Sequence, residues 1–390
     1  MNDMDEAERA ERRAIRRENM RRMKRRQQLF RRWLLPGFGL TVVMITGLVL
    51  LSVKIGKADT RHREKAATEL PAEELVAETG EKEAEEETEA VSSAEDLNQM
   101  ILVGDMEFFP GYEAVRTSDT VAIEQTEDME SEYAILVNAN TGVVVGERNA
   151  DVIMNPASMT KVMTVLVAAE QIENLDDETT ISQEAVDYSY AHDCSNVGYE
   201  VGETVKVRDL FYGTILPSGA DAAYELAMYT AGSQEAFVDL MNGKLAELGL
   251  ADSAHFTNCV GLYDENHYCT VYDMAMILKA AMENDWCREV LSAHIYEIPA
   301  SELHPDGIVL SNWFLRRIED KDTQGEVLGA KTGYVDQSGF CCASCQKSND
   351  GTPYICVTGK AHSNWRCIKD HVTIYTTYGR VSESSSEASE

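Results

Sequence analysis

An uncharged stretch of 21 residues near the N-terminus, Trp33 to Val53, most limits what this chain can fold into. In a helix, at about 1.5 Å per residue, it spans the roughly 30 Å hydrocarbon core of a bilayer. Residues 1–32 before it contain 12 basic and 6 acidic residues. The positive-inside rule therefore predicts a cytoplasmic basic segment at 1–32, one transmembrane helix at 33–53 in contact with membrane lipid, and an extracytoplasmic remainder. A cleaved signal peptide stays as the alternative, although such peptides usually have shorter basic and apolar regions.

The charge of the chain is strongly acidic and unevenly distributed. Its 35 Lys and Arg residues oppose 67 Asp and Glu residues, for a net charge of −32. Because nucleic-acid binding depends on basic residues that neutralise phosphates, this balance argues against a nucleic-acid partner. Residues 58–99 hold 4 basic and 14 acidic residues, which favours an extended chain. We therefore expect a mostly disordered acidic stalk at 54–128, with an ordered patch at Met106–Tyr112 left open, and a disordered tail at 381–390.

The remaining segment, 129–380, has the pattern of one globular domain. Two β-rich runs around an Asn- and Gly-containing loop predict a hairpin, and three more lie nearly two hundred residues downstream: Tyr133–Val137, Val143–Glu147, Glu326–Thr332, Gly339–Cys345 and Tyr354–Gly359. Apolar residues at three- and four-residue spacing predict helices at Leu210–Leu216, Ala220–Thr230, Gln234–Leu248, Val271–Glu283 and Asn364–Tyr378. This order predicts an α+β fold, in which an antiparallel sheet assembled from both chain ends is flanked by helices and a helical subdomain is inserted between its strands.

A short motif, Pro156-Ala157-Ser158-Met159-Thr160-Lys161, opens a nearly all-apolar run, and Asn155 and Pro156 favour a helix start there. On a helix, three-residue spacing puts Ser158 and Lys161 on one face, where the amine can reach the hydroxyl. A Ser hydroxyl is a weak nucleophile unless a base takes its proton, and a Lys amine is such a base only when burial or a positive neighbour lowers its pKa. The S-x-x-K pattern is common by chance, so by itself it also fits an ordinary capped helix with a surface Lys.

Two further motifs change this interpretation. Leu216-Pro217-Ser218-Gly219-Ala220-Asp221 opens a predicted helix, and Gly329-Ala330-Lys331-Thr332-Gly333 lies on a predicted strand. In this order and at these separations, the three motifs resemble the S-x-x-K, S-x-N and K-T-G of penicillin-recognising serine enzymes. The resemblance runs from about Tyr133 to Gly379 and includes Asn149-Ala150-Asp151, Met241-Asn242, Glu247-Leu248-Gly249-Leu250, Phe256-Thr257-Asn258, Gly261-Leu262 and His267-Tyr268. The chain is most similar to low-molecular-weight penicillin-binding proteins that are serine-type D-alanyl-D-alanine carboxypeptidases, which implies a β-lactamase/transpeptidase-like fold.

The resemblance implies a role for each matching residue. Ser158 would attack the penultimate D-Ala carbonyl of a peptidoglycan stem peptide ending in D-Ala-D-Ala, with Lys161 as general base and Ser218 passing the proton to the leaving amine. Lys331, Thr332, Gly333 and Tyr334 would bind substrate: the Lys and Thr side chains would hold the terminal carboxylate, and the backbone N–H groups of Ser158 and Tyr334 would hold the oxyanion. β-Lactam antibiotics would acylate Ser158. The family also implies a site outside the bacterial cell membrane, a role in cell wall biosynthesis, no cofactor and no metal.

Two features depart from the family pattern. Where the family usually has the Asn of S-x-N, this chain has Ala220, and so lacks an amide that normally contacts Lys161 and the substrate. Because Ser218, Gly219 and Asp221 follow the pattern, we expect only weakened positioning, which Ala220→Asn would repair by about 10-fold in kcat/KM. If the site is instead rebuilt around Ala220, the same substitution would lower activity.

The chain also ends after its last predicted helix, so the second, β-rich domain and the C-terminal membrane helix of many relatives are expected to be absent. A binding-only relative, a β-lactamase, and a transpeptidase or endopeptidase stay as alternatives.

The nine cysteines are an odd number, so at least one is unpaired. Cys342 and Cys345 form a C-x-x-C pattern, but residues three apart on a strand lie on opposite faces, so we expect buried small hydrophobes there rather than a redox or zinc site. Cys259 and Cys269 flank a loop and are a possible disulfide. His267 is expected to form hydrogen bonds in that loop rather than bind a metal.

Overall fold

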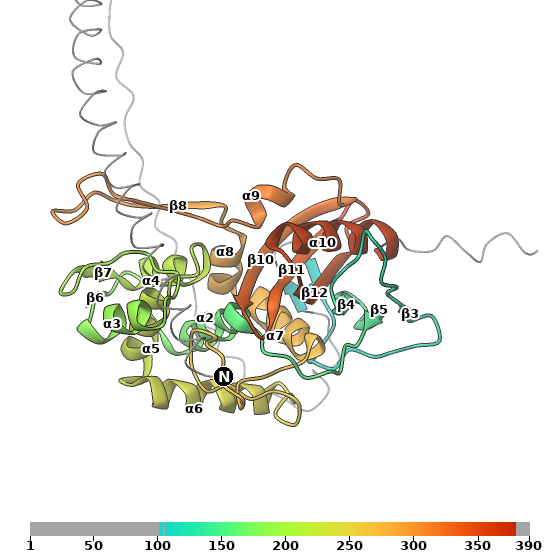
Figure 1. Cartoon of the computed structure of the whole chain (residues 1–390), viewed down its shortest axis with the longest axis horizontal. Coiled ribbons are helices and arrows are strands. Elements are labelled where there is room, and N and C mark those ends of the chain that lie inside the picture. The colour runs from blue at the N-terminus through green and yellow to red at the C-terminus, as the bar shows by residue number, and fades with distance from the viewer. Residues whose placement is uncertain (1–100, 104–105, 380–390) are drawn as a thin grey trace, which may run out of the picture. The chain divides into compact units, whose positions relative to one another are not determined.

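Six strands form the central sheet of the structure, a computed structural model that describes residues 101–103 and 106–379 (Figure 1). In spatial order they are β10 (Gly325–Val335), β11 (Gly339–Ser348), β12 (Pro353–Ala361), β4 (Tyr133–Asn138), β5 (Val143–Arg148) and β3 (Val121–Ala122). Strands from the N-terminal and C-terminal parts of the described domain meet where β12 pairs with β4, so that Tyr354 lies opposite Asn138. The predicted assembly from both chain ends is confirmed. The sheet is mixed rather than antiparallel throughout, because the short edge strand β3 pairs parallel with β5.

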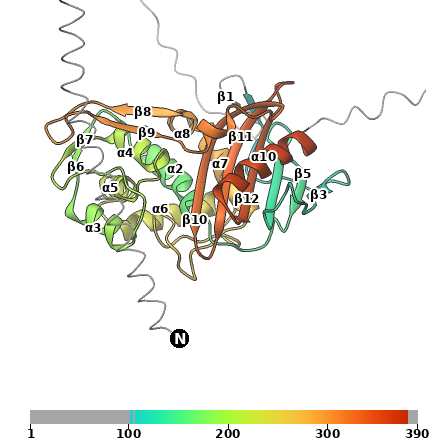
Figure 2. The same ribbon diagram turned by 45° about the horizontal axis from the view of Figure 1, so that its top comes forward.

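Helices cover both faces of this sheet, and Figure 2 shows α10 (Asn364–Tyr378) lying across its strands. On the opposite face, α7 (Val271–Glu283) packs against β11, β12 and β4. Alternation along β12 explains the two layers, because Ile355 and Val357 join the core on the α7 side whereas Tyr354 and Cys356 join the core on the α10 side. Burial on both faces accounts for the nearly continuous apolar sequence of this strand.

The helical subdomain lies between β5 and β10 in the sequence. Its helices are η2 (Ala157–Thr160), α2 (Lys161–Gln171), α3 (Gln183–Ala191), α4 (Val207–Ile215), α5 (Ala220–Ala231), α6 (Gln234–Glu247), α7, α8 (Asp285–Ser292) and α9 (Leu315–Ile318). Three small antiparallel pairs complete the described elements: β1 (Ile101–Val103) with β2 (Met106–Phe108), β6 (Glu178–Thr180) with β7 (Thr204–Lys206), and β8 (Ile295–Ile298) with β9 (Ile308–Ser311). All five predicted helices are present, within three residues of the expected ends.

Residues 106–128, expected at the end of the stalk, instead pack against the domain. Phe108 and Phe109 are buried, and Lys279 Nζ on α7 lies 4.5 Å from the ring centroids of Phe109 and Tyr112. The Lys279 ammonium forms an ion pair with Glu283, whose other carboxylate oxygen accepts the Tyr112 hydroxyl at 2.9 Å. Because a buried charge is tolerated only with a partner, this cluster fixes the segment to α7. Ordered structure therefore begins before the expected boundary at 129.

The other expected segments of the N- and C-terminal regions lie outside the described residues. These are the basic segment at 1–32, the membrane span at 33–53, the stalk up to residue 100, and the tail at 381–390. Within 101–103 and 106–379, no helix combines the length and the apolar character needed to cross a bilayer.

Candidate active site

Ser158 lies in the short 3₁₀ helix η2, immediately before α2. The structure differs here from the continuous helix expected from Pro156, because α2 begins only at Lys161. Ala157 has φ = +47°, a left-handed conformation that a residue with a Cβ rarely adopts, and Asn155 Oδ1 supports it by accepting the Ala157 N–H at 2.9 Å. Across this junction, Lys161 Nζ lies 3.1 Å from Ser158 Oγ. The predicted nucleophile and base are therefore in hydrogen-bond contact.

Lys161 is almost completely buried and has a second partner. Its Nζ donates to the Val260 carbonyl oxygen at 2.8 Å. Burial lowers the pKa of Lys161 from 10.5 to about 8, and the nearby Cys194, Cys259 and Asp221 partly oppose this effect. With this pKa, about a tenth of the protein molecules have a neutral Lys161 amine at pH 7. The neutral amine is the form that can take a proton from a hydroxyl.

Lys331 on β10 forms a second lysine–serine pair. Its Nζ donates to Ser218 Oγ at 2.9 Å and to the Thr332 carbonyl oxygen at 2.7 Å. Ser218 lies in the turn between α4 and α5 with φ = +62°. Burial lowers the pKa of Lys331 to about 7, and the positive charge of Lys161 contributes to this decrease. The two ammonium groups therefore disfavour each other's charge, and the site promotes loss of one proton from the pair.

Gly333 brings β10 against residues 156–160, which carry the predicted nucleophile Ser158 and are called the nucleophile turn below. A Cβ at this position would lie 2.9 Å from Ser158 N, from the Pro156 carbonyl oxygen and from Cys341 Sγ. Only glycine permits this close approach, which explains why the residue after Lys331-Thr332 is glycine in this chain.

The remaining predicted residues of the third motif follow along the same strand. Thr332 is half-buried, whereas Tyr334 is 51% exposed. The Tyr334 ring stacks on Phe340 with a centroid distance of 4.3 Å, and its hydroxyl donates to Asp336 at 2.8 Å. β10 thus carries Lys331, Thr332 and Tyr334 in one short run beside the nucleophile turn.

Ala220, the departure from S-x-N, is the first residue of α5 and is fully buried. Its N–H donates to the Ser195 carbonyl oxygen at 2.7 Å. The adjacent Asp221 accepts the backbone N–H groups of Val197 at 2.9 Å and Gly198 at 3.0 Å. Asp221 therefore holds the loop at 195–198 and does not stand in for the missing amide.

All nine cysteines are free, so the possible disulfide between Cys259 and Cys269 is wrong. Cys342 and Cys345 are fully buried and belong to the cores on opposite faces of β11, which confirms the prediction of buried small hydrophobes. Among the residues that the structure describes, no three His, Cys, Asp or Glu side chains lie together so that they could hold a metal ion.

Sequence reasoning missed the turn at 258–262, whose Val260 carbonyl contacts Lys161. Asn258, Gly261 and Leu262 enter only through the family resemblance, although an Asn three residues before a Gly is a recognisable turn signal. His267 forms loop hydrogen bonds, as predicted, but it also reaches the nucleophile turn, because its Nε2 lies 2.8 Å from Thr160 Oγ1. These contacts belong to the candidate active site, although they lie outside the three motifs.

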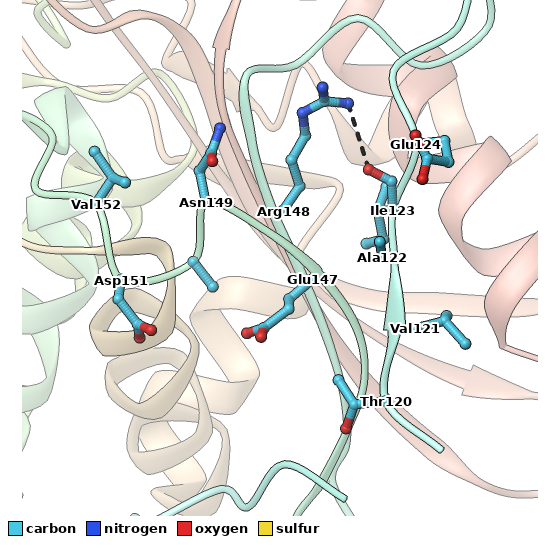
Figure 3. Close-up of a pocket in the computed structure, with 11 residues that line it drawn as sticks. Thr120, Val121, Ala122, Ile123, Glu124, Glu147, Arg148, Asn149, Asp151 and Val152 are labelled. Carbon is cyan, nitrogen blue, oxygen red and sulfur yellow. Dashed lines mark hydrogen bonds between the residues drawn. The ribbon is translucent and has the colours of Figure 1, made fainter. Parts of the chain in front are cut away.

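A separate pocket of about 580 Å³ lies between β3 and the end of β5 (Figure 3). Residues 120–124 and 147–152 line it, and Arg148 extends to the Ile123 carbonyl oxygen at 3.3 Å. None of the predicted site residues lines this pocket, so it is distinct from the candidate active site.

Comparison with known proteins gives consistent matches. The family model for D-alanyl-D-alanine carboxypeptidase matches residues 119–362. The chain is 30% identical over 225 residues to D-alanyl-D-alanine carboxypeptidase DacF of Bacillus subtilis, covering 56% of this chain and 55% of the relative. It is 33% identical over 218 residues to the D-alanyl-D-alanine carboxypeptidase of Streptomyces sp. strain K15, covering 53% of this chain and 72% of the relative. The match to DacF thus spans about half of that relative's length.

A solved structure agrees with these sequence matches. The crystal structure of the Streptomyces K15 DD-transpeptidase superimposes with a TM-score of 0.59 at 26% identity, covering 65% of this chain and 98% of that chain.

Proposed function

The chain belongs to the D-alanyl-D-alanine carboxypeptidase family, and we propose that it removes the terminal D-Ala from peptidoglycan stem peptides ending in D-Ala-D-Ala. The observation that carries this proposal is the pair of lysine–serine contacts: Lys161 Nζ lies 3.1 Å from Ser158 Oγ, and Lys331 Nζ lies 2.9 Å from Ser218 Oγ. A hydroxyl beside a buried amine of lowered pKa is the arrangement that nucleophilic acyl transfer requires.

In the first half-reaction, Ser158 Oγ attacks the carbonyl carbon of the penultimate D-Ala while its proton moves to the neutral Lys161 amine. The backbone N–H groups of Ser158 and Tyr334 donate to the oxyanion. The C–N bond to the terminal D-Ala then breaks, and the proton passes through Ser218 to the leaving amine. Water hydrolyses the resulting ester and restores the Ser158 hydroxyl.

Lys331 and Thr332 bind the terminal carboxylate of the substrate in this proposal. A carboxylate beside Lys331 raises the pKa of that lysine and keeps it charged. Its charge in turn disfavours the charged form of Lys161, because the repulsion that contributes to the lowered pKa of Lys331 acts on both groups. Substrate binding thereby favours a protonated Lys331 and a neutral Lys161, which is the combination that the first step needs.

The substrate lies outside the bacterial cell, and the N-terminal sequence supports a matching location. We place residues 1–32 in the cytoplasm, residues 33–53 across the cell membrane and the catalytic domain outside, on the basis of the uncharged stretch and the basic residues before it. β-Lactam antibiotics acylate Ser158 in this proposal, because they present a reactive carbonyl and a carboxylate to the same groups.

The likeness to a structure described as a DD-transpeptidase favours a second candidate function. A transpeptidase forms the same acyl-enzyme but transfers the acyl group to an amine instead of water. The two activities therefore share Ser158, Lys161 and Ser218 and differ only in the acceptor.

One experiment tests these functions together. The full chain, solubilised in detergent, is incubated with a pentapeptide ending in D-Ala-D-Ala, with and without an amine acceptor, and free D-Ala and transfer product are measured. A fluorescent penicillin is used in parallel, and its adduct is located by mass spectrometry. We expect D-Ala release and an adduct on Ser158, and neither in folded Ser158→Ala. An adduct without D-Ala release supports the binding-only alternative, and folded wild type with neither contradicts the proposal.

A further inference from the structure

The turn at 258–262 is organised by one side chain. Asn258 is buried, and its Oδ1 accepts the backbone N–H groups of Val260 at 3.2 Å, Gly261 at 2.7 Å and Leu262 at 2.9 Å. Its Nδ2 donates to the Leu262 carbonyl oxygen at 3.0 Å. A side-chain amide that binds successive backbone groups fixes the peptide planes between them, and therefore the directions of their carbonyl groups.

Two carbonyl oxygens of this turn contact the first turn of α2. The Val260 oxygen accepts Lys161 Nζ at 2.8 Å, and the Cys259 oxygen accepts the Thr164 hydroxyl at 2.6 Å. The Lys161 amine is therefore held between the Val260 carbonyl and Ser158 Oγ, which lies 3.1 Å away.

The segment around the turn also contacts the nucleophile turn. Gly261 has φ = +85°, and a Cβ on it would lie 1.9 Å from the Ala157 carbonyl oxygen, so the two backbones are in close contact. His267 Nδ1 accepts the Thr257 N–H at 3.0 Å, and Nε2 therefore carries the hydrogen that it donates to Thr160 Oγ1 at 2.8 Å. Burial lowers the pKa of His267 to about 3, which agrees with a neutral ring.

We infer that Asn258 is a positioning residue for acyl transfer, because it directs the Val260 carbonyl oxygen at the Lys161 amine and so holds that amine beside Ser158. The inference rests on the proposed function and adds to it a residue outside the three motifs. A neutral amine has two N–H bonds and one lone pair. With one N–H bound to the Val260 oxygen, rotation about the Cε–Nζ bond is restricted, and the lone pair can be kept toward the Ser158 hydroxyl.

The same carbonyl stabilises the charge that forms in the reaction. When the Ser158 proton reaches Lys161, the new ammonium keeps its hydrogen bond to the Val260 oxygen, and this bond becomes charge-assisted. The family's Asn at the position of Ala220 would offer an amide oxygen to this lysine. The Val260 carbonyl supplies an acceptor of the same kind from the backbone, which gives a physical reason why Ala220 is compatible with a positioned base.

The test compares Asn258→Ala with Asn242→Ala in the full chain. Asn242 is a matched control, because its Oδ1 accepts the Phe256 N–H at 2.9 Å and its Nδ2 donates to the Phe256 carbonyl oxygen at 2.8 Å. It therefore holds the same segment by the same kind of contact, but it does so at Phe256, two residues before Asn258.

Two properties are measured. The first is the titration of Lys161 without ligand, followed by NMR of protein with isotope-labelled lysine and assigned by the signal missing in Lys161→Arg. The second is the pH profile of acylation by a fluorescent penicillin. The other groups that act electrostatically on Lys161 are Cys194, Cys259, Asp221 and Lys331, and both variants retain them.

In folded Asn258→Ala we expect the Lys161 titration to move down by about one pH unit, because the ammonium loses a fixed acceptor. Acylation should slow by about ten-fold or more, and its acid limb should move to lower pH. Asn242→Ala should lose thermal stability without either shift. An unchanged Lys161 titration in Asn258→Ala, or equal shifts in both variants, overturns the inference.

Asn258→Asp keeps the acceptor oxygens and should recover most of the acylation rate. A folded Asp variant as slow as Asn258→Ala also overturns the inference, and Asn258→Ser takes the place of the Ala variant if that variant does not fold. If wild type is not acylated at Ser158, the proposed function fails, but the Lys161 titration still decides whether Asn258 positions this lysine.

Discussion

Gly261→Ala tests how closely the turn at 258–262 must approach the nucleophile. A Cβ on residue 261 would lie 1.9 Å from the Ala157 carbonyl oxygen and 2.9 Å from Ser158 N, whereas ordinary contact begins near 3.4 Å. The two backbones must therefore separate by about 1.5 Å at the Ala157 oxygen. Because a misplacement of about 1 Å can cost 100-fold in rate, we expect acylation at Ser158 to fall by about two orders of magnitude. The left-handed backbone adds about 1–2 kcal/mol of strain.

Gly249→Ala separates the displacement from the strain. Gly249 has φ = +75°, but a Cβ there would meet nothing within 4 Å. Both variants should therefore lose a similar amount of stability to backbone strain, and only Gly261→Ala should also lose acylation. The assay is the rate constant for labelling by a fluorescent penicillin, measured beside the melting temperature of each protein. A folded Gly261→Ala protein that is labelled as fast as Gly249→Ala would refute the reasoning that this contact sets the position of Ser158.

Three further outcomes are expected. Ala220→Asn should slow D-Ala release and cost about 1–3 kcal/mol of unfolding free energy, because a larger side chain must enter a fully buried position; a faster variant in the same assay would restore the weakened-site interpretation. Burial lowers the pKa of His267 and His371 from 6.5 to about 3, so the stability they contribute is complete above pH 6.5 and is lost as the pH falls toward 3. His371→Gln should flatten the dependence of melting temperature on pH in this window, and an unchanged slope would contradict the assignment. In native protein Cys194 should react with a thiol reagent before any other cysteine, because the other eight are buried, and Cys194→Ser should remove the first phase seen in a thiol count.

The sequence predicts those parts of the molecule that depend on local pattern. Helix α7 has its predicted bounds because an apolar repeat follows a capping box between Thr270 and Asp273. The three motifs likewise contain both lysine–serine pairs, because the proposed acyl transfer depends on those side chains. By contrast, β3 has only two residues, Val121 and Ala122, too few to show a periodic pattern.

Contacts between distant segments could not be predicted in this way. The partner of Lys161 is a backbone carbonyl 99 residues away, whose direction depends on the Asn258 side chain rather than on the identity of Val260. The burial of Ala220 depends on the loop at 195–198, which reaches α5 through the carboxylate of Asp221. For this reason the expectation for Ala220→Asn changes sign once the packing is known.

The sequence left an ordered patch at Met106–Tyr112 open, but it could not identify α7 as the partner of this segment, because the Tyr112 hydroxyl meets Glu283 across 171 positions of the chain. Residues 58–99, for which the acidic composition predicts an extended chain, lie outside the described residues, and that composition gives no information on where the aromatic residues at 108–112 pack.

The aromatic cluster around Lys279 determines how far the domain can be shortened. A chain that begins at residue 119, where the family match starts, keeps the Lys279–Glu283 pair but lacks Phe108, Phe109 and Tyr112. The α7 face that these three aromatic side chains cover would then be exposed to water. α7 is the helix that packs against β11, β12 and β4. The cooperative unfolding unit therefore includes residues that precede all three motifs of the candidate active site. A protease that cuts between residues 113 and 118 would weaken the support of the sheet without removing any residue of the candidate active site.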